Sequence, residues 1–566
     1  MEIEKNYQRW LTSSGVSKED KEILKKMSSE EKADAFFKDV EFGTAGMRGI
    51  LGPGTNRMNI FTVRKATVAF AQYLLEKFPD AKKRGVVISH DNRHMSREFT
   101  LLIADTFNRF GINTYIFDSL RPTPELSFAV RYQKAVAGVM VTASHNPKEY
   151  NGYKVYDEFG CQLVPEKINR LVELISLLPN ELEVVVPSGI KLGKNSVLSK
   201  KIDDEYVRLV EAIALNPNLD KSNFKIVYTP NHGTSYVNAM RIFKDFNYDV
   251  YPVIKQCDPD PDFSGTLSPN PEEAKSYIEP IKLAKEIGAK LICMTDPDGD
   301  RVGLAALDRS GEYVLFTGNQ SAALLMDYIF SMRKKQGTLS KDGIMYSTIV
   351  TSSLGAKIAA SYGIKNEIFL TGFKFIGNQI QHYEEINGPK FEFGYEESYG
   401  CLISPFARDK DGLQAILLYC EMALYYDKKG KNLIEAFDDL GKRYGYHVDQ
   451  VTSREFKGPT GQKEMKELMN GLHDKPILKL GSRVVTAVED YQKQISIKDG
   501  KKTKINLPQS DVVKMYFNDG SNVAIRPSGT EPKCKFYIGA VAKNKKDAEL
   551  AAKEIYEDLM KYLNIK

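Results

Sequence analysis

The chain has 566 residues, of which 42% are hydrophobic and 27% are charged. These fractions are average for soluble globular proteins, so they exclude wholesale disorder, collagen and coiled coil. The length implies several domains, because one domain usually takes about 100–200 residues. Lys and Arg exceed Asp and Glu by 79 − 74 = 5. No dense basic block or aromatic platform accompanies this small excess, so we expect no nucleic-acid partner.

Targeting signals are not evident. The N-terminus has neither the basic nor the apolar region of a secretory signal. The longest apolar stretch, residues 415–426, contains Glu421 and is shorter than the roughly 20 residues of a membrane span. The six cysteines form no Cys-x-x-Cys pair, which disfavours structural disulfides and a zinc site. We expect a cytoplasmic protein with no membrane partner, and composition leaves its oligomeric state open.

Short apolar runs alternate with helical patterns along the chain, which is typical of α/β folds. Residues 1 to about 40 predict a helical extension, with Ser28 or Ser29 as an N-cap before Glu31. The next region predicts a sheet that is largely buried on both faces. Its elements are a strand at 85–90, a helix at 96–110, a strand at 112–117, a helix at 124–133 and a strand at 137–141.

The α/β pattern then restarts twice before a different C-terminal region. The second region predicts strands at 224–228 and 290–295 with a helix at 236–246, and the third predicts strands at 343–350 and 367–370 with a helix at 354–362. The C-terminal region predicts strands at 483–487, 522–525 and 534–539 and a helix at 546–563. We therefore expect three α/β units and a smaller α+β unit, covering residues 1–205, 206–315, 316–445 and 446–566.

Two acidic loops are candidate metal sites. Asp296-Pro-Asp-Gly-Asp-Arg301 follows a predicted strand and places carboxylates at alternate positions, and its Pro and Gly supply the turn that makes them converge. Oxygen ligands of this kind suit a hard cation such as Mg²⁺, although a bare acidic turn with no ion is an equal alternative. In the competing run Asp258-Pro-Asp-Pro-Asp262 the two prolines stiffen the chain, so we expect a structural role there.

Three further loops carry polar side chains beside predicted elements. Thr142-Ala-Ser-His-Asn-Pro147 leaves a strand where α/β sheets usually bind ligands, and it presents Ser144, which in isolation would more often be a turn or N-cap serine. Gly394-Tyr-Glu-Glu-Ser-Tyr-Gly400 offers carboxylates and a hydroxyl suited to sugar hydroxyls. Arg408-Asp-Lys-Asp-Gly412 adds cations, but in isolation it is typical of a charged surface loop.

The C-terminal loop Arg526-Pro-Ser-Gly-Thr-Glu-Pro-Lys533 joins two predicted strands. Its two hydroxyls, its glycine and its two cations favour a phosphate cradle over a plain hairpin.

Together with Gly43-Thr-Ala-Gly-Met-Arg-Gly49, these loops resemble the α-D-phosphohexomutase superfamily, specifically its phosphoglucomutase and phosphomannomutase members. The motifs occur in the family's order over most of the chain. The resemblance implies three related α/β domains with mixed sheets and a C-terminal α+β domain of the TATA-binding-protein type, arranged around a central cleft.

The resemblance also implies roles for individual residues. Ser144 would carry a phosphoryl group, and Mg²⁺ would be held by a phosphoserine oxygen with Asp296, Asp298 and Asp300. Acid/base roles fall to Lys154 and Arg48, of which Lys154 is the better candidate because burial and neighbouring cations can lower a lysine pKa. We expect His145 to orient or stabilise Ser144, although neighbours on an extended segment point to opposite sides.

Two sets of residues would bind the substrate. The sugar would contact Arg301, Thr371, Gly372, Glu396, Ser398 and Lys410. The non-reacting phosphate would contact Arg526, Ser528, Gly529, Thr530 and Lys533. Some mutases place a histidine just after the sugar loop, whereas Gly400-Cys401 follows here, which leaves the acid/base residue of the second half-reaction open.

The implied activity is an isomerase that interconverts glucose 1-phosphate and glucose 6-phosphate through a phosphoserine enzyme, with glucose 1,6-bisphosphate as intermediate and activator. Its partners would be small sugar phosphates. The sequence Glu396-Glu-Ser-Tyr-Gly400 favours glucose, while mannose and pentose phosphates stay open as alternatives. A sugar-phosphate-binding sensor or scaffold is the non-enzymatic alternative, which the intact Ser144 and aspartate triplet disfavour.

Overall fold

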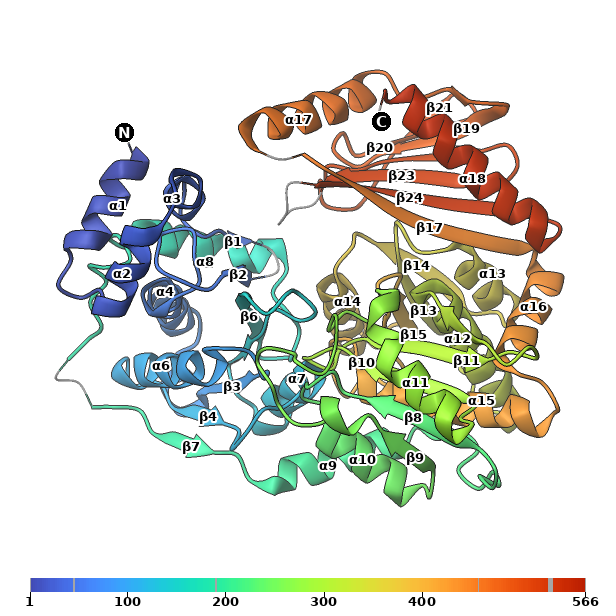
Figure 1. Cartoon of the computed structure of the whole chain (residues 1–566), viewed down its shortest axis with the longest axis horizontal. Helices are drawn as coiled ribbons and strands as arrows, with labels where there is room; N and C mark the ends of the chain where they lie inside the picture. Colours follow the sequence, from blue (N-terminus) through green and yellow to red (C-terminus); the bar gives the residue numbers. More distant parts are fainter. Residues whose placement is uncertain (1, 44–45, 189–190, 457, 528–532, 565–566) are drawn as a thin grey trace. The chain divides into compact units, whose positions relative to one another are not determined.

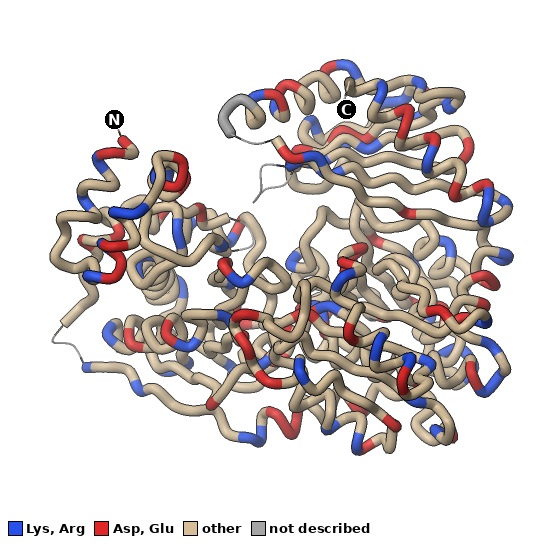
Figure 2. The backbone as a smooth tube through the Cα atoms, viewed as in Figure 1, with Lys and Arg blue, Asp and Glu red and all other residues tan. Residues whose placement is uncertain are grey.

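The computed structural model describes residues 2–43, 46–188, 191–456, 458–527 and 533–564. The chain forms two compact units (Figure 1): unit 1 holds Met1–Thr317 and Gly372–Tyr425, and unit 2 holds Gly318–Thr371 and Tyr426–Lys566. Basic and acidic residues are interspersed along both units (Figure 2), as the small net charge leads one to expect.

Unit 1 begins with a three-helix extension: α1 (Glu2–Thr12), α2 (Lys18–Lys26) and α3 (Ser29–Phe36). Of the two expected N-caps, Ser28 caps α3, and it does so in a capping box with Glu31. Trp10 is fully buried, and its ring meets Phe61 edge-on at a centroid distance of 5.3 Å. The Trp10 indole N–H donates to Glu181 Oε1 at 2.7 Å, so the extension is anchored to the α/β region that follows.

The first α/β region is built on a seven-stranded mixed sheet in the order β1-β2-β6-β5-β3-β4-β7. Strands β3, β4, β5 and β7 run parallel where they pair, and β6 and β2 are antiparallel. Every residue of β3 and β5 is buried, which confirms the expected double-sided burial. The bounds are β1 (Phe42–Gly43), β2 (Gly46–Ile50), α4 (Ile60–Lys77), α5 (Ala81–Arg84), β3 (Val86–His90), α6 (Ser96–Arg109), β4 (Thr114–Ile116), α7 (Thr123–Gln133), β5 (Ala137–Val141), β6 (Tyr150–Asp157), α8 (Pro165–Leu177) and β7 (Asn195–Val197).

The second region of unit 1 carries a five-stranded mixed sheet in the order β12-β11-β10-β8-β9. Strand β10 runs parallel to β8 and antiparallel to β11. The loop between β10 and β11 therefore leaves the carboxyl end of β10, in the interior of the strand order. The bounds are α9 (Lys200–Glu211), β8 (Lys225–Thr229), α10 (Tyr236–Asp245), β9 (Asp249–Pro252), two 3₁₀ turns at Ile254–Gln256 and Ala274–Tyr277, α11 (Ile278–Ile287), β10 (Leu291–Thr295), β11 (Val302–Leu307) and β12 (Tyr313–Phe316).

The rest of unit 1 consists of α14 (Phe373–Glu385), the hairpin of β15 (Lys390–Glu396) and β16 (Gly400–Leu402), and all but the last turn of α15 (Gly412–Lys428). The apolar stretch from residue 415 forms α15, which is buried from Gly412 to Leu424. In the described part of the chain, no helix combines the length and the apolarity that a bilayer span requires. All six cysteines are free and buried.

Unit 2 contains a parallel strand pair with helices and a C-terminal antiparallel sheet. Its first elements are α12 (Gly318–Gln336), β13 (Gly343–Thr348), α13 (Ser353–Ser361), β14 (Lys365–Phe369) and α16 (Leu433–Tyr444). The sheet follows the order β17-β24-β23-β22-β19-β20-β21, and β18 pairs with β19. The bounds are β17 (Tyr446–Glu455), α17 (Gly458–Asp474), β18 (Lys479–Leu480), β19 (Arg483–Asp490), β20 (Ile495–Lys498), β21 (Lys501–Lys504), β22 (Val513–Phe517), β23 (Asn522–Pro527), β24 (Lys533–Ala542) and α18 (Lys545–Tyr562).

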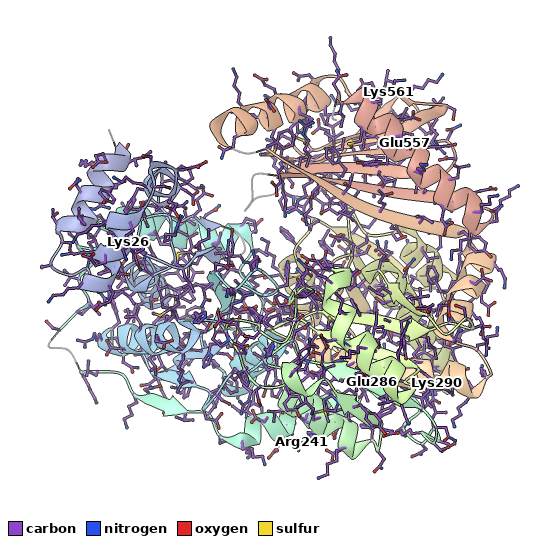
Figure 3. All side chains as sticks on the ribbon, viewed as in Figure 1. Lys26, Arg241, Glu286, Lys290, Glu557 and Lys561 are labelled. Carbon is purple, nitrogen blue, oxygen red and sulfur yellow. The ribbon has the colours of Figure 1, made fainter. Side chains whose placement is uncertain are left out.

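Helices α17 and α18 cover one face of this sheet. Ile555 and Leu559 of α18 pack with Val513 and Met515 of β22 in one apolar core, while Glu557 and Lys561 lie on the exposed side of the helix (Figure 3). Alternate residues of each strand therefore face the helices or the polar side.

The elements predicted from the sequence are all present with ends shifted by a few residues. Helix α4 was not predicted, because nearly every position from Phe61 to Leu74 is buried and no polar stripe marks the helical period. Strand β6 was not predicted either, and it carries Lys154.

Candidate active site

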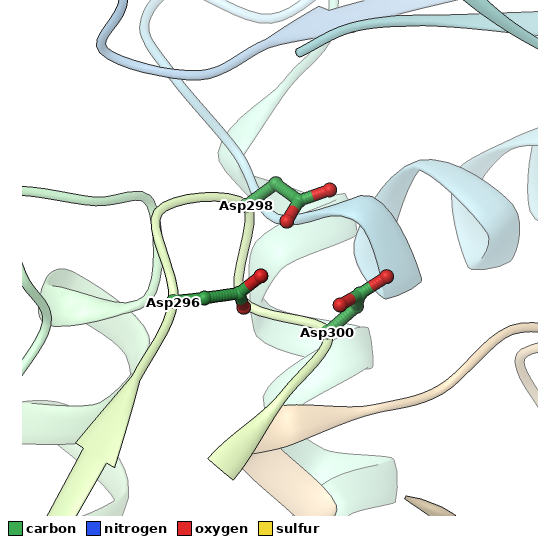
Figure 4. A group of neighbouring side chains, drawn as sticks. All are labelled: Asp296, Asp298 and Asp300. Carbon is green, nitrogen blue, oxygen red and sulfur yellow. The ribbon is translucent and has the colours of Figure 1, made fainter. Parts of the chain in front are cut away.

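The acidic loop 296–301 lies between β10 and β11, and its three carboxylates converge (Figure 4). Asp296 and Asp298 are fully buried and Asp300 is 3% exposed. One oxygen from each lies within 4.8 Å of the others. Gly299 has φ +70°, a conformation that side chains disfavour, so glycine is required for the turn that brings the carboxylates together.

This triplet fits a hard divalent cation. Asp298 Oδ1 and Asp300 Oδ1 are buried polar atoms without a hydrogen-bond partner, and burying such atoms is unfavourable unless something coordinates them. Burial, followed by the charges of Asp298 and Asp300, raises the pKa of Asp296 well above its ordinary value. A divalent cation would relieve this repulsion, and oxygen ligands are those that Mg²⁺ prefers. The triplet could therefore bind Mg²⁺.

The competing acidic run 258–262 does not converge in this way. Asp262 is exposed and lies 3.1 Å from Lys148 Nζ and 3.2 Å from His94 Nε2. Among the described residues, only the triplet at 296, 298 and 300 forms an acidic group that could hold a metal.

Ser144 lies just beyond the end of β5 and faces the acidic loop. Its Oγ donates to Asp296 Oδ2 at 2.7 Å, and its side chain is buried. The Ser144 backbone has φ +53°, in the left-handed region. A non-glycine residue held there costs about 1–3 kcal/mol, and such strain is kept only where the surrounding contacts determine it.

The left-handed turn at Ser144 also corrects the expected position of His145. Alternation on an extended segment would place the two side chains on opposite sides, but His145 Nδ1 lies 3.1 Å from Ser144 Oγ because the backbone is not extended there. Burial, and then the cationic groups of Arg301 and Arg48, lower the pKa of His145 well below its usual value. The imidazole is therefore neutral near pH 7.

Lys154 projects from β6 to the acidic loop. Its Nζ lies 2.7 Å from Asp298 Oδ2 and 3.8 Å from Asp300 Oδ2. Burial alone would lower the pKa of Lys154, but the two carboxylates raise it overall. The expected lowering is therefore wrong in this arrangement, because anions rather than cations are the nearest charged neighbours. Lys154 in turn affects Asp298. Burial alone would raise the pKa of Asp298, but the positive charge of Lys154 holds that pKa below its ordinary value.

The remaining proposed acid/base residue lies beside the serine loop. Arg48 is on β2, and its Nη1 donates to Asn146 Oδ1 at 2.9 Å, two residues after Ser144. Strand β2 pairs with β6, which places Arg48 opposite Gly152.

Lys410 links the proposed sugar loop to the acidic loop. Lys410 Nζ lies 3.3 Å from Glu396 Oε2 and 3.3 Å from Asp300 Oδ2. Glu396 Oε1 accepts the backbone N–H of Gly372 at 2.7 Å. Burial favours protonation of Glu396, but Lys410, Gly372 and Arg301 together lower its pKa, so Glu396 is an anion next to the cation of Lys410.

Three other proposed sugar-binding residues are Arg301, Ser398 and Thr371. Arg301 donates its backbone N–H to Asp296 Oδ1 at 3.0 Å and its Nη1 lies 2.5 Å from Glu272 Oε1. Ser398 is half-buried in the turn between β15 and β16. Thr371 is half-buried and closes the first segment of unit 2.

The segment from Arg408 to Asp411 is not a surface loop. The expectation that its charges, taken in isolation, mark a charged surface loop is therefore wrong. All four side chains are buried, with exposures of 0–9%. Each charge has a partner: Arg408 pairs with Glu384, Asp409 accepts from Tyr156 at 2.9 Å, and Asp411 accepts from Tyr206 at 2.9 Å. Buried charges persist when they are paired in this way, and the partners lie far away in the sequence.

The proposed phosphate loop belongs to unit 2. Arg526 is at the end of β23 and Lys533 begins β24, and these antiparallel strands confirm that the loop joins a hairpin. Ser528, Gly529 and Thr530 lie outside the described residues.

The structure brings in groups that sequence reasoning missed. Thr123 Oγ1 donates to Asp298 Oδ2 at 2.8 Å, and Thr123 N donates to Asp298 O. Arg93 donates to the Ser144 carbonyl, and Asp91 accepts from the Thr142 hydroxyl. Nothing local marks these residues, because their contacts span 51 to 175 positions.

Comparison with known proteins places this site in a family. Models described as phosphoglucomutase/phosphomannomutase alpha/beta/alpha domains I, II and III match residues 39–178, 204–309 and 317–444, and the C-terminal domain of the same family matches residues 474–556. Together with the mixed sheets, these matches confirm the expected four-domain α/β architecture.

Individual relatives agree over nearly the whole chain. A phosphoglucomutase of Staphylococcus epidermidis is 37% identical over 523 residues, covering 92% of this chain and 94% of its own. A phosphoglucomutase of Staphylococcus aureus is 35% identical over 528 residues, with 93% and 94% covered. The crystal structure of a putative phosphomannomutase from Thermus thermophilus shares the fold at a TM-score of 0.69 and 22% identity, covering 93% of this chain and 99% of its own. This chain belongs to the phosphoglucomutase/phosphomannomutase family.

Proposed function

We propose that this chain is a phosphoglucomutase, which interconverts glucose 1-phosphate and glucose 6-phosphate with Ser144 as the phosphoryl carrier. The observation that supports this role most directly is the 2.7 Å contact between Ser144 Oγ and Asp296 Oδ2 at the edge of a buried acidic triplet. Its relatives in two Staphylococcus species carry the name phosphoglucomutase.

In the proposed reaction, phospho-Ser144 donates its phosphoryl group to the free hydroxyl of a hexose monophosphate. The bond from phosphorus to Ser144 Oγ breaks and the bond from phosphorus to the sugar oxygen forms. The sugar hydroxyl gives up one proton and Ser144 Oγ takes up one, so the serine is left as a neutral hydroxyl. Glucose 1,6-bisphosphate results. After the bisphosphate reverses its orientation, its other phosphate returns to Ser144, so the enzyme is regenerated and the isomer is released.

Five groups at the site suit these steps. Asp296, Asp298 and Asp300 would hold Mg²⁺, which neutralises phosphoryl charge when it is bound. Lys154, whose pKa the aspartates raise, would stabilise the transferring phosphoryl group as a cation. We assign proton exchange at Ser144 Oγ to the neutral imidazole of His145, 3.1 Å away.

Substrate recognition divides between two sets of groups. Glu396 and Lys410, already ion-paired beside Asp300, would bind the sugar hydroxyls. Arg526 and Lys533 would hold the non-reacting phosphate. The Glu396–Gly400 loop favours glucose over mannose and pentose phosphates. We also propose a cytoplasmic location, since oxidising compartments favour paired cysteines and all six are free here.

Phosphoryl labelling tests the proposal. Purified protein would be incubated with ³²P-labelled glucose 1,6-bisphosphate and Mg²⁺, and the label would be mapped by peptide digestion. We expect the label on Ser144, none on a Ser144→Ala variant, and normal labelling of a Ser222→Ala control, since Ser222 lies in an exposed turn. An unlabelled wild-type protein would refute the proposal and favour a sensor or scaffold. Comparing kcat/KM for glucose, mannose and ribose 1-phosphates then tests the sugar preference.

A further inference from the structure

One buried side chain holds most of the loop that carries Ser144. Arg93 Nη2 donates to the carbonyl oxygens of Ser144 and Asn146 at 2.6 and 2.5 Å. Its Nη1 donates to those of Pro147 and Tyr150 at 2.7 and 3.0 Å. A planar guanidinium presents several N–H groups in a fixed fork, so a single residue fixes four carbonyl groups along seven residues of chain.

Asp91, the ion-pair partner of Arg93, also holds the loop, through Thr142. Asp91 Oδ2 lies 3.2 Å from Arg93 Nε, and both side chains are fully buried. Asp91 Oδ2 also accepts from Thr142 Oγ1 at 2.6 Å, and that hydroxyl oxygen accepts the backbone N–H of Ser144 at 2.8 Å. The N–H and the C=O of Ser144 are therefore both connected to the Asp91–Arg93 pair.

These contacts account for the strained backbone at Ser144. A residue at φ +53° would relax to an extended or helical conformation unless its amide and carbonyl groups were held in place. Relaxation would swing Oγ away from Asp296 and from His145, because both contacts depend on the left-handed turn.

We propose that Arg93 is a positioning residue for phosphoryl transfer, whose guanidinium holds the loop 144–150 so that Ser144 Oγ faces the acidic triplet. This inference rests on the proposed function of Ser144. Arg93 acts through the backbone of the loop, and the atoms it contacts are carbonyl oxygens rather than reacting groups.

The acidic run 258–262, which forms no metal site, has a role in the same assembly. The ring of Phe263 covers the Arg93 guanidinium, 5.1 Å from ring centroid to Cζ, and is itself 4% exposed. Asp262 lies 3.1 Å from Lys148 Nζ on the serine loop, and the Asp260 carbonyl accepts from Asn92 Nδ2 at 2.7 Å. Phe263, the residue that follows the run, therefore covers Arg93, and the run itself contacts Asn92 and Lys148 on either side. Shielding from water strengthens the hydrogen bonds of the guanidinium.

Chemical rescue distinguishes positioning from a merely structural role. In an Arg93→Ala variant, the rate of Ser144 phosphorylation by labelled glucose 1,6-bisphosphate should fall about 100-fold, the loss that a small misplacement of a reacting group produces. Added guanidinium at low millimolar concentration should restore much of the rate, whereas ammonium at the same ionic strength should not. An Arg109→Ala variant, which removes an exposed arginine of α6, serves as the matched control and should label normally.

Two further variants keep the test decisive if Arg93→Ala does not fold. Arg93→Lys retains the charge, but an ammonium group cannot donate to four carbonyl oxygens at once. Ser144 of this variant should therefore be phosphorylated slowly, and added guanidinium should not raise the rate. Phe263→Leu removes the ring that covers the Arg93 guanidinium. Amide hydrogen exchange should then become faster in residues 144–150, while the exchange rates of other peptides stay unchanged.

The possible results separate this inference from the proposed function. Wild-type labelling rates in both Arg93→Lys and Arg93→Ala would overturn the positioning role, as would a folded Arg93→Ala protein that guanidinium does not rescue. If the wild-type protein itself takes no label, the proposed function fails instead.

Discussion

Gly400, which ends the proposed sugar loop, allows a test of the role of Lys410, because the Lys410 side chain packs directly against this glycine. A Cβ built on Gly400 would lie 2.0 Å from Lys410 Cδ and 2.8 Å from its Cε. Carbon atoms pack at about 3.5–4.0 Å, so in a Gly400→Ala variant the Lys410 side chain must shift by about 1.5–2 Å. Its Nζ would then leave Glu396 Oε2 and Asp300 Oδ2, each 3.3 Å away.

The size of the effect follows from these contacts. A hydrogen bond to a charged group contributes about 1.5–3 kcal/mol, and about 1.4 kcal/mol corresponds to a tenfold change. Losing one such contact in the transition state should therefore lower kcat/KM for glucose 1-phosphate about 10–100-fold. Stability should change little. The clash falls on a flexible side chain rather than on backbone, and alanine also restricts the unfolded chain, which offsets about 0.4–1 kcal/mol.

The assay is steady-state turnover alongside thermal unfolding. Gly471→Ala is the matched control, because the Cβ that it adds in α17 meets nothing within 4 Å apart from the helix's own backbone. A double variant with Lys410→Met should be no worse than Lys410→Met alone, since the alanine acts through that lysine. Wild-type kcat/KM in a folded Gly400→Ala protein would refute the reasoning, and additive losses in the double variant would assign the effect to another group.

Three further predictions concern the metal and the C-terminal sheet. Asp298→Asn should lower turnover by orders of magnitude while circular dichroism shows an intact fold, and near wild-type activity would exclude Asp298 as a metal ligand. Treatment with EDTA should abolish turnover, and added Mg²⁺ should restore it; activity that survives a chelator would contradict the role of the acidic triplet. His473 lies 2.8 Å from Asp511 and 3.0 Å from Asp490, and Asp511, then Asp490, raise its pKa. Its protonated form stabilises the fold fully below the unfolded pKa of about 6.5 and ceases to do so as pH rises through the higher folded pKa. The Tm should therefore fall by more in the wild type than in His473→Gln as pH rises above about 6.5, and parallel Tm curves would contradict this.

The sequence by itself determined features whose cause is local. The α/β alternation, a serine N-cap before Glu31, and the convergence of Asp296, Asp298 and Asp300 depend on residues a few positions apart. The turn with Pro297 and Gly299, which has φ +70°, brings those carboxylates together within one short loop.

Only the tertiary structure decided what depends on distant partners. The left-handed turn at Ser144, which brings His145 beside its Oγ, is held by Arg93, about 50 residues away. The raised pKa of Lys154 comes from carboxylates more than 140 positions distant. Charges such as Arg408 and Asp411 are buried because their partners meet them in the fold. Composition and spacing describe a residue's own chemistry, whereas burial, backbone strain and protonation depend on neighbours that only folding assembles.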